Sequence, residues 1–427
     1  MRILWVTNQP IAYLRDMLKI SLGQSGGWME QSYGVIKESP KFTIGVATIY
    51  EGTELLHSQA DGNDFYAVPS RQTMNAYDSC DFYNLSQWDS VINDFKPDLI
   101  HVWGSEYPIG LCALKAAKGI PSVVYMQGML NQLANHYCDG VSPWEQLRYI
   151  SIVDIKRWNF LWSRKKSFEK AAKREAELLN LANNVIVESD WCAYNCLSVA
   201  PKCTVYRSAL PISSVYFEYD WDYEKCEKHS IFTVAGGYPI KGHHMLLKAF
   251  AKVVKEYPDA KLYIPGQSNV TANDFKNRIR KTTYDNIISA IIKEYHLQNN
   301  IVYLGRLSPE QMAQQIEKCN IFVMPSSCEN HSSSLIEAMI VGAPTISSYV
   351  GGISQYYKDG DNGLFYRFDE PDVLSAMIVK YFENKDFTKG LAQKGKKRER
   401  DNRSGINLIE DYNFIYNSIV IKNSKGL

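Results

Sequence analysis

The sequence predicts an α/β protein made of two domains, each built around a parallel sheet. Short runs of β-branched and apolar residues alternate with helical stretches along most of the 427 residues. Several of the strand-like runs are apolar at consecutive positions, as expected of strands that are buried on both faces. The alternation breaks once, at residues 209–230, and then restarts. Strands that alternate with helices are typical of βαβ units, which form parallel sheets.

Each expected strand is a short run rich in Val, Ile and Leu, and each expected helix is a longer stretch with apolar residues three or four positions apart. In the first half we expect strands at residues 2–7, 43–48, 99–102, 122–126 and 184–187, and helices at 88–94, 110–117 and 158–182. In the second half we expect strands at 230–234, 261–264, 301–304, 321–324 and 344–347, and helices at 241–256, 274–296, 308–318, 333–341 and 405–420.

The break at 209–230 divides the chain into an N-terminal domain, 1–212, and a C-terminal domain, 213–404. The remaining residues, 405–427, are expected to form a helix that crosses back to the N-terminal domain. In an open α/β sheet, ligands bind outside the carboxyl ends of the strands. Two such domains that face each other would place a ligand in the cleft between them.

Composition excludes several classes of protein. The 47 Lys and Arg nearly balance the 46 Asp and Glu, for a net charge of +1, which argues against nucleic acid as a partner. No run of about 18 apolar residues is present to span a membrane. The N-terminus reads as a strand rather than a signal peptide, so we expect a cytoplasmic protein. The nine cysteines include no CxxC pair, and we expect free thiols and no metal site.

The strongest functional signal is a strand, loop and helix at residues 321–342. Glu329 follows the strand, and Glu337 lies one turn inside the helix. Between them, Ser332, Ser333 and Ser334 open the helix, where free N–H groups and the positive end of the helix dipole favour an anion. Carboxylates accept hydrogen bonds from sugar hydroxyls, so the arrangement suits a phosphorylated sugar or a nucleotide sugar.

Two further loops follow expected strands. The sequence GGYPIKGHH begins at Gly236 and places Lys241 at the start of a helix, where a cation is costly unless an anion binds. In the first domain, Gly26 and Gly27 precede Trp28 and would allow the backbone to approach a ligand closely, although a plain turn explains them equally well. The pattern is not G-x-G-x-x-G, which argues against a dinucleotide dehydrogenase.

These motifs resemble the retaining glycosyltransferases of the GT-B fold, in glycosyltransferase family 4. Their E-x7-E signature matches Glu329 and Glu337, and the stretch 341–366 is also similar. The resemblance implies that Glu329 contacts hydroxyls of the donor sugar and that Glu337 holds the ribose. It also implies that Lys241 binds the donor diphosphate together with backbone amides near Leu335. The remaining donor-site residues that it implies are Gly237, Arg306, His331, Ser332, Ser333 and Ser334.

The sequence departs from the family at two positions. The family usually carries an Arg where Gly236 stands, so that part of the diphosphate charge must be met elsewhere, for which Arg306 is a candidate. Many members carry a histidine where Gln127 stands. Glutamine can donate a hydrogen bond but cannot carry a proton near neutral pH, so Gln127 would orient the sugar. The family loop over diphosphate and acceptor corresponds to Gly26, Gly27 and Trp28.

A basic stretch, 156–174, carries eight Lys or Arg and one Glu, interleaved with Trp and Phe. It predicts either contact with an anionic membrane or a solvated helix face.

From the motifs and the family resemblance together, we expect a hexosyltransferase that transfers a sugar from a nucleotide diphosphate donor to a saccharide or lipid-linked saccharide, with no catalytic metal and no cofactor. Its setting would be the synthesis of capsule, O-antigen or exopolysaccharide, at the inner face of the plasma membrane. The alternatives are a nucleotide-sugar 2-epimerase and a non-catalytic nucleotide-sugar-binding or scaffold protein.

Overall fold

The computed structural model describes residues 1–20, 27–70, 80, 82–266, 270, 280–404 and 406–425. The chain divides into two compact units, each with one sheet. The first unit comprises Met1–Asn131, Ser167–Pro211 and Ile406–Leu427, and the second comprises Gln132–Lys166 and Ile212–Gly405. The segment 132–166, which the sequence placed in the N-terminal domain, makes its contacts within the second unit.

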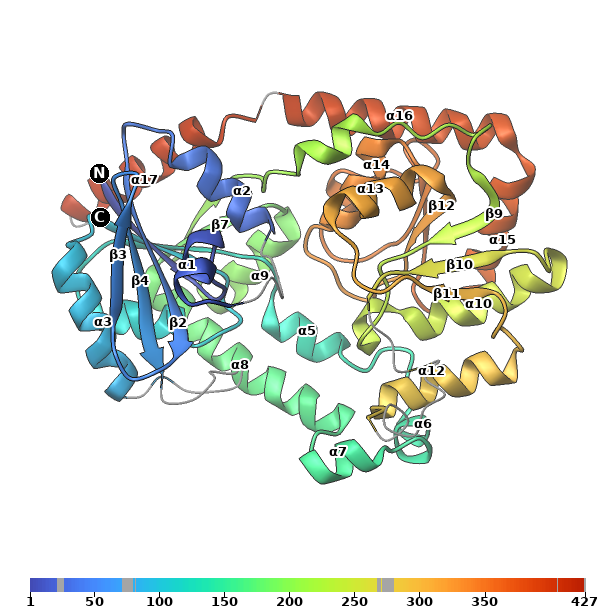
Figure 1. Ribbon diagram of the computed structural model, residues 1–427, viewed down its shortest axis with the longest axis horizontal. Coiled ribbons are helices and arrows are strands. Elements are labelled where there is room, and N and C mark those ends of the chain that lie inside the picture. Colours follow the sequence, from blue (N-terminus) through green and yellow to red (C-terminus); the bar gives the residue numbers. More distant parts are fainter. Residues whose placement is uncertain are drawn as a thin grey trace. The chain divides into compact units, whose positions relative to one another are not determined.

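The sheet of the first unit has the strand order β3-β4-β2-β1-β5-β6-β7-β8, and Figure 1 labels β2, β3, β4 and β7 of this sheet. All neighbouring strands are parallel except β3, which pairs with β4 in the antiparallel sense. The strands are β1 (Arg2–Thr7), β2 (Thr43–Glu51), β3 (Leu56–Ala60), β4 (Asn63–Ser70), β5 (Leu99–Trp103), β6 (Ser122–Tyr125), β7 (Asn184–Val187) and β8 (Thr204–Arg207).

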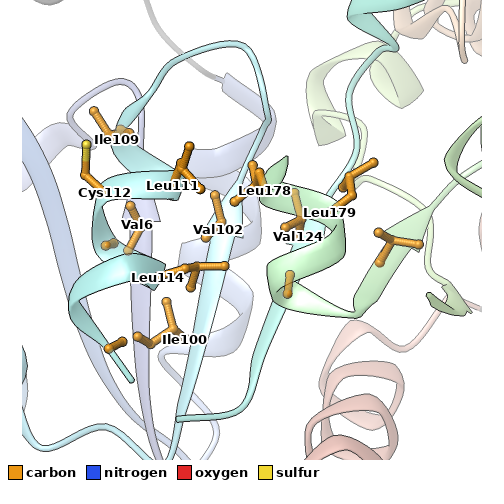
Figure 2. Close-up of a cluster of buried hydrophobic side chains, with 14 of the residues drawn as sticks. Val6, Ile100, Val102, Ile109, Leu111, Cys112, Leu114, Val124, Leu178 and Leu179 are labelled. Carbon is orange, nitrogen blue, oxygen red and sulfur yellow. The ribbon is translucent and has the colours of Figure 1, made fainter. Parts of the chain in front are cut away.

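Helices cover both faces of this sheet. Buried side chains of α3, α4, α8 and α9 form one core with the sheet, which Figure 2 shows around Val102, Leu114 and Leu178. Those of α1, α2 and α17 form a second core on the other face. The helices are α1 (Ala12–Met17), α2 (Gly27–Ile36), α3 (Phe82–Phe95), α4 (Ile109–Ala116), α8 (Leu161–Ala182), α9 (Asp190–Val199) and α17 (Leu408–Ser424).

The C-terminal helix α17 belongs to the first unit because its aromatic face completes that second core. Tyr412 and Tyr416 are fully buried there, and the Tyr416 hydroxyl lies 2.7 Å from Nδ1 of His101 in β5. Burial lowers the pKa of His101 to about 3, so its imidazole is neutral. His101 is therefore a core residue, as its position in the middle of a strand suggests.

The sheet of the second unit is parallel throughout, with the order β11-β10-β9-β12-β13-β14. Helices α13, α14 and α16 share one buried core with it. The strands are β9 (Glu227–Phe232), β10 (Lys261–Ile264), β11 (Ile301–Tyr303), β12 (Cys319–Met324), β13 (Thr345–Ser348) and β14 (Leu364–Tyr366). The principal helices are α10 (His243–Glu256), α12 (Thr283–Glu294), α13 (Pro309–Lys318), α14 (Ser333–Val341), α15 (Pro371–Glu383) and α16 (Lys385–Ser404).

The segment 132–166 continues α5 (Leu130–His136) and contains two short helices, α6 (Pro143–Arg148) and α7 (Ile152–Arg157). It is fixed to α12 by polar contacts. The backbone N–H of Thr283 donates to Oδ2 of Asp154 over 2.6 Å, and the side chain of Asn286 donates to the carbonyl of Tyr149. Figure 1 shows α6 and α7 beside α12, in agreement with these contacts.

The expected strands are all present, with bounds that differ by a few residues. Strands β3, β4, β8 and β14 were not expected, because their residues lack a continuous apolar run or follow a turn-rich loop. Part of the helix expected at 274–296 lies outside the described residues, and α12 accounts for the rest.

The nine cysteines are all free, and seven of them are buried, as expected. Within the part of the chain that the structure describes, no helix is both long and apolar enough to cross a bilayer.

Helix α8 carries two leucines in different environments. Leu178, in the core shown in Figure 2, is 1% exposed, whereas Leu181 lies outside this core and is 47% exposed. We expect Leu178→Ala to lower the free energy of unfolding by about 2–5 kcal/mol, because it removes buried methyl groups and leaves a cavity. Leu181→Ala should change it by less than about 0.5 kcal/mol. Chemical denaturation of both variants measures the difference, and equal losses would contradict the burial of this face of α8.

Candidate functional site

Lys241 is positioned by the loop that follows β9. After the strand, the chain forms a short 3-10 helix, η2 (Pro239–Lys241), and Gly242 then starts α10. Gly242 has a φ of +69°, and a Cβ atom there would lie 1.8 Å from the carbonyl oxygen of Pro325. Only glycine therefore allows the loop after β9 to lie against the loop after β12.

Glu329 is positioned by the loop that follows β12. The backbone N–H of Ser327 donates to the carbonyl of Ile240 over 2.7 Å, which joins this loop to the first one. Ser332 then caps α14, since its side chain accepts from the N–H of Leu335. The strands β9 and β12 are neighbours in a parallel sheet, so their carboxyl ends bring the two loops to the same edge.

The two loops meet in an ion pair. Nζ of Lys241 donates to Oε1 of Glu329 over 2.6 Å, and the hydroxyl of Ser326 donates to the same oxygen over 2.7 Å. The side chains are 29% and 14% exposed, so the pair is accessible only in part. Burial is the largest single influence and would lower the pKa of Lys241, but the charge and hydrogen bond of Glu329, together with Tyr238 and Cys328, outweigh it and raise the pKa above its usual range. Lys241 is therefore a fixed cation.

A third loop, after β13, supports the backbone of Glu329. The N–H of Gly352 donates to the carbonyl of Glu329 over 3.2 Å. Gly351 has a φ of +53°, and a Cβ atom there would lie 1.7 Å from that carbonyl oxygen. Gly351 thus lets the third loop approach the loop that carries Glu329. Three adjacent strands, β9, β12 and β13, contribute to one site.

The start of α14 lies at the same edge of the sheet. Ser332 is buried, Ser333 and Ser334 are half-buried, and the helix points its first N–H groups towards its N-terminus. These groups and the helix dipole favour an anion, and Lys241 adds a full positive charge on a neighbouring strand end. The arrangement can therefore bind a phosphate or diphosphate.

Glu337 lies inside α14 in a different environment. Burial raises its pKa to about 7, although a hydrogen bond with Tyr216 and the charge of Arg403 act in the opposite direction. Tyr216 belongs to a 3-10 helix, η1 (Ser214–Glu218), and is 5% exposed. The carboxyl of Glu337 is thus divided between its protonated and ionised forms near neutral pH, a property that the E-x7-E spacing does not predict.

The other expected donor-site residues lie around this edge at varying depth. Gly237, with a φ of +74°, is exposed in the loop after β9. The ring of His331 contacts the ring of Tyr356 at 4.6 Å between centroids, and Leu335 is fully buried in α14. Arg306 is exposed in the loop after β11, which is the edge strand two places from β9.

The residues expected in the first unit are described only in part. Gly26 lies outside the described residues, and Gly27 and Trp28 begin α2, with side chains that are not described. Gln127 is half-buried in the loop between β6 and α5.

Sequence reasoning missed two carboxyl groups in the first unit. Glu106 and Gln127 both reach towards Gly104, at the end of β5, where a Cβ atom would lie 2.4 Å from Oε2 of Glu106 and 3.0 Å from Nε2 of Gln127. Glu175 of α8 is 1% exposed and accepts from the hydroxyl of Ser105 over 2.5 Å. Burial raises the pKa of Glu175 to about 8. The signal available in the sequence was the position of Ser105 and Glu106 directly after a strand.

No group of three or more His, Cys, Asp or Glu side chains lies close enough to hold a metal ion in the ranges that the structure covers. Diphosphate binding without a metal remains a prediction.

Residues 218–398 match the family model described as glycosyl transferases group 1. This stretch, which is less than half of the chain, contains Lys241, Glu329 and Glu337. An uncharacterized glycosyltransferase of Methanocaldococcus jannaschii is 32% identical over 108 residues, which are 25% of this chain and 31% of that protein. The chain thus spans about a third of the length of this curated relative.

Two solved structures match almost the whole chain. Sucrose-phosphate synthase of Thermosynechococcus elongatus has a TM-score of 0.70 at 15% identity and covers 98% of both chains. The Anabaena protein HepE, in complex with UDP and glucose, has a TM-score of 0.63 at 16% identity and covers 98% of this chain and 99% of its own. At these identities the likeness shows the fold, which is that of the GT-B glycosyltransferases.

The raised pKa of Glu337 predicts a pH-dependent stability. Because its pKa is about 7 in the folded chain and lower in the unfolded chain, the group lowers stability as pH rises from about 4.5 to 7, and its effect is constant above that range. Glu337→Gln should remove this part of the decline. Thermal unfolding of both proteins across this pH range measures the effect.

Glu310→Gln is the control, because Glu310 lies at the start of the neighbouring helix α13, where a backbone N–H holds its pKa below its usual range. This variant should not flatten the decline. Parallel pH profiles for the wild type and Glu337→Gln would contradict the burial of this carboxyl group.

Proposed function

We propose that this chain is a retaining glycosyltransferase of family 4 that transfers a sugar from a nucleotide diphosphate donor to a hydroxyl. The observation that carries the proposal is the Lys241–Glu329 pair, at 2.6 Å, beside the N-terminus of α14. A fixed cation and the backbone N–H groups of the first turn of α14 favour a diphosphate, and an adjacent carboxylate suits sugar hydroxyls. This arrangement lies inside the stretch that matches the glycosyl transferases group 1 model.

Donor binding would replace the contact between Lys241 and Glu329 with contacts from each of these residues to the donor. The diphosphate would take the ammonium of Lys241 and the N–H groups at the start of α14, around Ser333–Leu335. Glu329 would then accept hydrogen bonds from the donor sugar, while Ser326 continues to orient its carboxylate. Glu337 would accept from the ribose hydroxyls, and donor binding would favour its ionised form. Gly237, His331 and Arg306 complete the proposed donor site.

The proposed transfer balances without a cofactor or a catalytic metal. The acceptor oxygen attacks the anomeric carbon on the face of the leaving group, and the bond from that carbon to the phosphate oxygen breaks. The electron pair leaves with the nucleoside diphosphate, whose charge Lys241 stabilises. The proton of the acceptor hydroxyl passes to the departing phosphate. Gln127 cannot take this proton and would orient the sugar.

The acceptor that we propose is a saccharide or a lipid-linked saccharide, in the synthesis of capsule, O-antigen or exopolysaccharide at the inner face of the plasma membrane. The basic segment 156–174 supports a contact with anionic lipid. Its residues lie on α7 and α8, with Lys156, Arg157 and Lys166 exposed in the second unit and Lys170 and Lys173 exposed in the first.

Non-catalytic binding of a nucleotide sugar is the second candidate. It is favoured by Gly236, where the family usually carries an arginine, and by Gln127, where many members carry a histidine. An epimerase of the same fold would also bind the donor, but its product would be a changed nucleotide sugar rather than a glycoside.

A donor panel tests the proposal, with UDP-glucose first because HepE was solved with UDP and glucose. Release of nucleoside diphosphate is measured with and without a saccharide acceptor. Lys241→Met and Glu329→Gln should each lower kcat by about 100-fold or more, because each removes a charge that the transition state uses. Lys252→Met is the control, because Lys252 lies in the same unit and pairs with Asp372 at the surface.

Several outcomes would contradict the proposal. Donor binding without release on any acceptor would favour the binding protein, and an altered nucleotide sugar would favour the epimerase. A product with inverted anomeric configuration would exclude the retaining assignment. Equal activity of Lys241→Met and Lys252→Met would show that the charge of Lys241 does not contribute to the transfer.

A further inference from the structure

The segment formed by α6, α7 and the start of α8 exposes an unusual number of large apolar side chains. Six of the sixteen large apolar side chains that are exposed in the described residues lie within positions 144–162. We call these six the apolar surface, and they are Trp144 (68% exposed), Leu147 (57%), Ile152 (72%), Ile155 (50%), Trp158 (78%) and Trp162 (37%). Exposed apolar side chains concentrated in one short segment are a feature of interaction sites in folded proteins.

The exposure is not a sign of poor folding, because the segment has well-formed local structure. A capping box between Ser142 and Glu145 starts α6, the side chain of Ser151 caps α7, and Trp158 ends α7 in the left-handed conformation with a φ of +52°. The backbone N–H of Ser151 donates to the hydroxyl of Thr283 over 3.2 Å, so the segment is also held by α12.

Helix α7 buries its carboxylate and exposes its isoleucines, whereas an ordinary surface helix does the opposite. Its one carboxylate, Asp154, is 2% exposed and accepts from the N–H of Thr283, at the start of α12. Its isoleucines, Ile152 and Ile155, point to solvent. A helix that buries its only carboxylate and exposes its isoleucines gains nothing from these two placements in water, whereas exposed isoleucines beside Lys156 and Arg157 suit an anionic apolar boundary.

The charge around the apolar surface is positive. Residues 142–166 contain six Lys or Arg and two acidic residues. Both acids are engaged, since Asp154 binds Thr283 and Glu145 accepts from Ser142 over 2.7 Å. Exposed Arg148, Lys156 and Arg157 alternate with the apolar side chains. A second copy of this chain would bring like charges together, whereas an anionic lipid surface would neutralise them.

We propose that α6, α7 and the start of α8 dock on an anionic bilayer, with the apolar surface inserted at the boundary between headgroups and acyl chains. Tryptophans favour this boundary because their rings are apolar and their N–H groups are polar. Lysine and arginine side chains can extend from there to lipid phosphates. The proposal deepens the membrane contact proposed above and moves it from the basic segment 156–174 to residues 144–166 of the second unit, which also carries the Lys241–Glu329 pair.

Co-sedimentation with vesicles tests the docking on the full chain. The vesicles contain phosphatidylcholine alone or a mixture with phosphatidylglycerol. The wild type should bind the mixture at least about tenfold more tightly than the neutral vesicles. Ile152→Ser combined with Trp158→Ser should lower binding to the mixture by about tenfold or more, because both apolar anchors are lost. Lys156→Glu combined with Arg157→Glu should remove the preference for the mixture.

Matched control variants test whether lipid binding depends on the apolar surface and its charges, or on any exposed apolar or charged side chain. Phe414→Ser removes a side chain that is 68% exposed on α17, and Lys255→Glu combined with Lys293→Glu changes two exposed charges elsewhere in the second unit. Both should bind as the wild type does. All of the changed residues are exposed, so melting temperatures should stay close to that of the wild type, and a variant that melts earlier is replaced by Trp158→Gln alone.

Three results would overturn the proposed membrane docking. No binding of the wild type to the mixture, or equal binding by the serine variants and Phe414→Ser, excludes lipid as the occupant. Sedimentation velocity that shows a dimer dissociated by Trp158→Ser would assign the surface to a second copy instead. Release of nucleoside diphosphate in solution is measured on the same variants. It should be unchanged, so a failure of docking and a failure of the proposed transfer give different results.

Discussion

The contact between Lys241 and Glu329 depends on one constraint, which is that β9 and β12 are neighbours in a parallel sheet. Parallel strands end at the same edge, so residues 88 positions apart in the sequence come within 2.6 Å. The contact also needs glycine at two places, because the backbones of the three loops pass too closely for a Cβ atom at Gly242 or Gly351. The sheet supplies the proximity, and the glycines supply the final approach. Donor binding, as proposed, uses a charge pair that the fold has already assembled.

The parts that the sequence predicted well are those that short stretches determine. The strand, loop and helix around Glu329 and Ser332 were expected with almost the observed bounds, because an apolar run, a cap and a helical period are local signals. The environment of Glu337 could not be predicted in the same way. Its pKa depends on burial, on a hydrogen bond with Tyr216 of η1 and on the charge of Arg403 near the end of α16, and these residues come together only in the folded unit. The sequence also could not predict that Glu106 and Glu175 of the first unit lie near each other. Their proximity depends on how α8 packs on the sheet, where Glu175 accepts from Ser105.

Segment 132–166 shows a second limit of sequence reasoning. A polarity pattern assumes that charged residues face water and apolar residues face the core. Here Asp154 is buried and accepts from the N–H of Thr283, the first residue of α12, whereas Ile152 and Ile155 are exposed to solvent. The basic residues after position 156 were visible in the sequence, but the apolar surface beside them was not. Only the partner of Asp154 reveals which face of α7 is buried.

The segment that carries the apolar surface is also tied to the loops of the candidate site. Nε2 of His244, three residues after Lys241, donates to the carbonyl of Asp139 over 3.0 Å, and its Nδ1 lies 2.9 Å from the hydroxyl of Tyr284 in α12. Burial lowers the pKa of His244 to about 3, so the ring is neutral and can donate from Nε2 while it accepts at Nδ1. The hydroxyl of Ser327, two residues before Glu329, donates to the carbonyl of His136. The loops that carry Lys241 and Glu329 are therefore both hydrogen-bonded to segment 132–166, which contains α6 and α7. A bilayer that holds α6 and α7, as proposed, would therefore also hold the proposed donor site at a fixed height above the lipid, as the proposed lipid-linked acceptor would require.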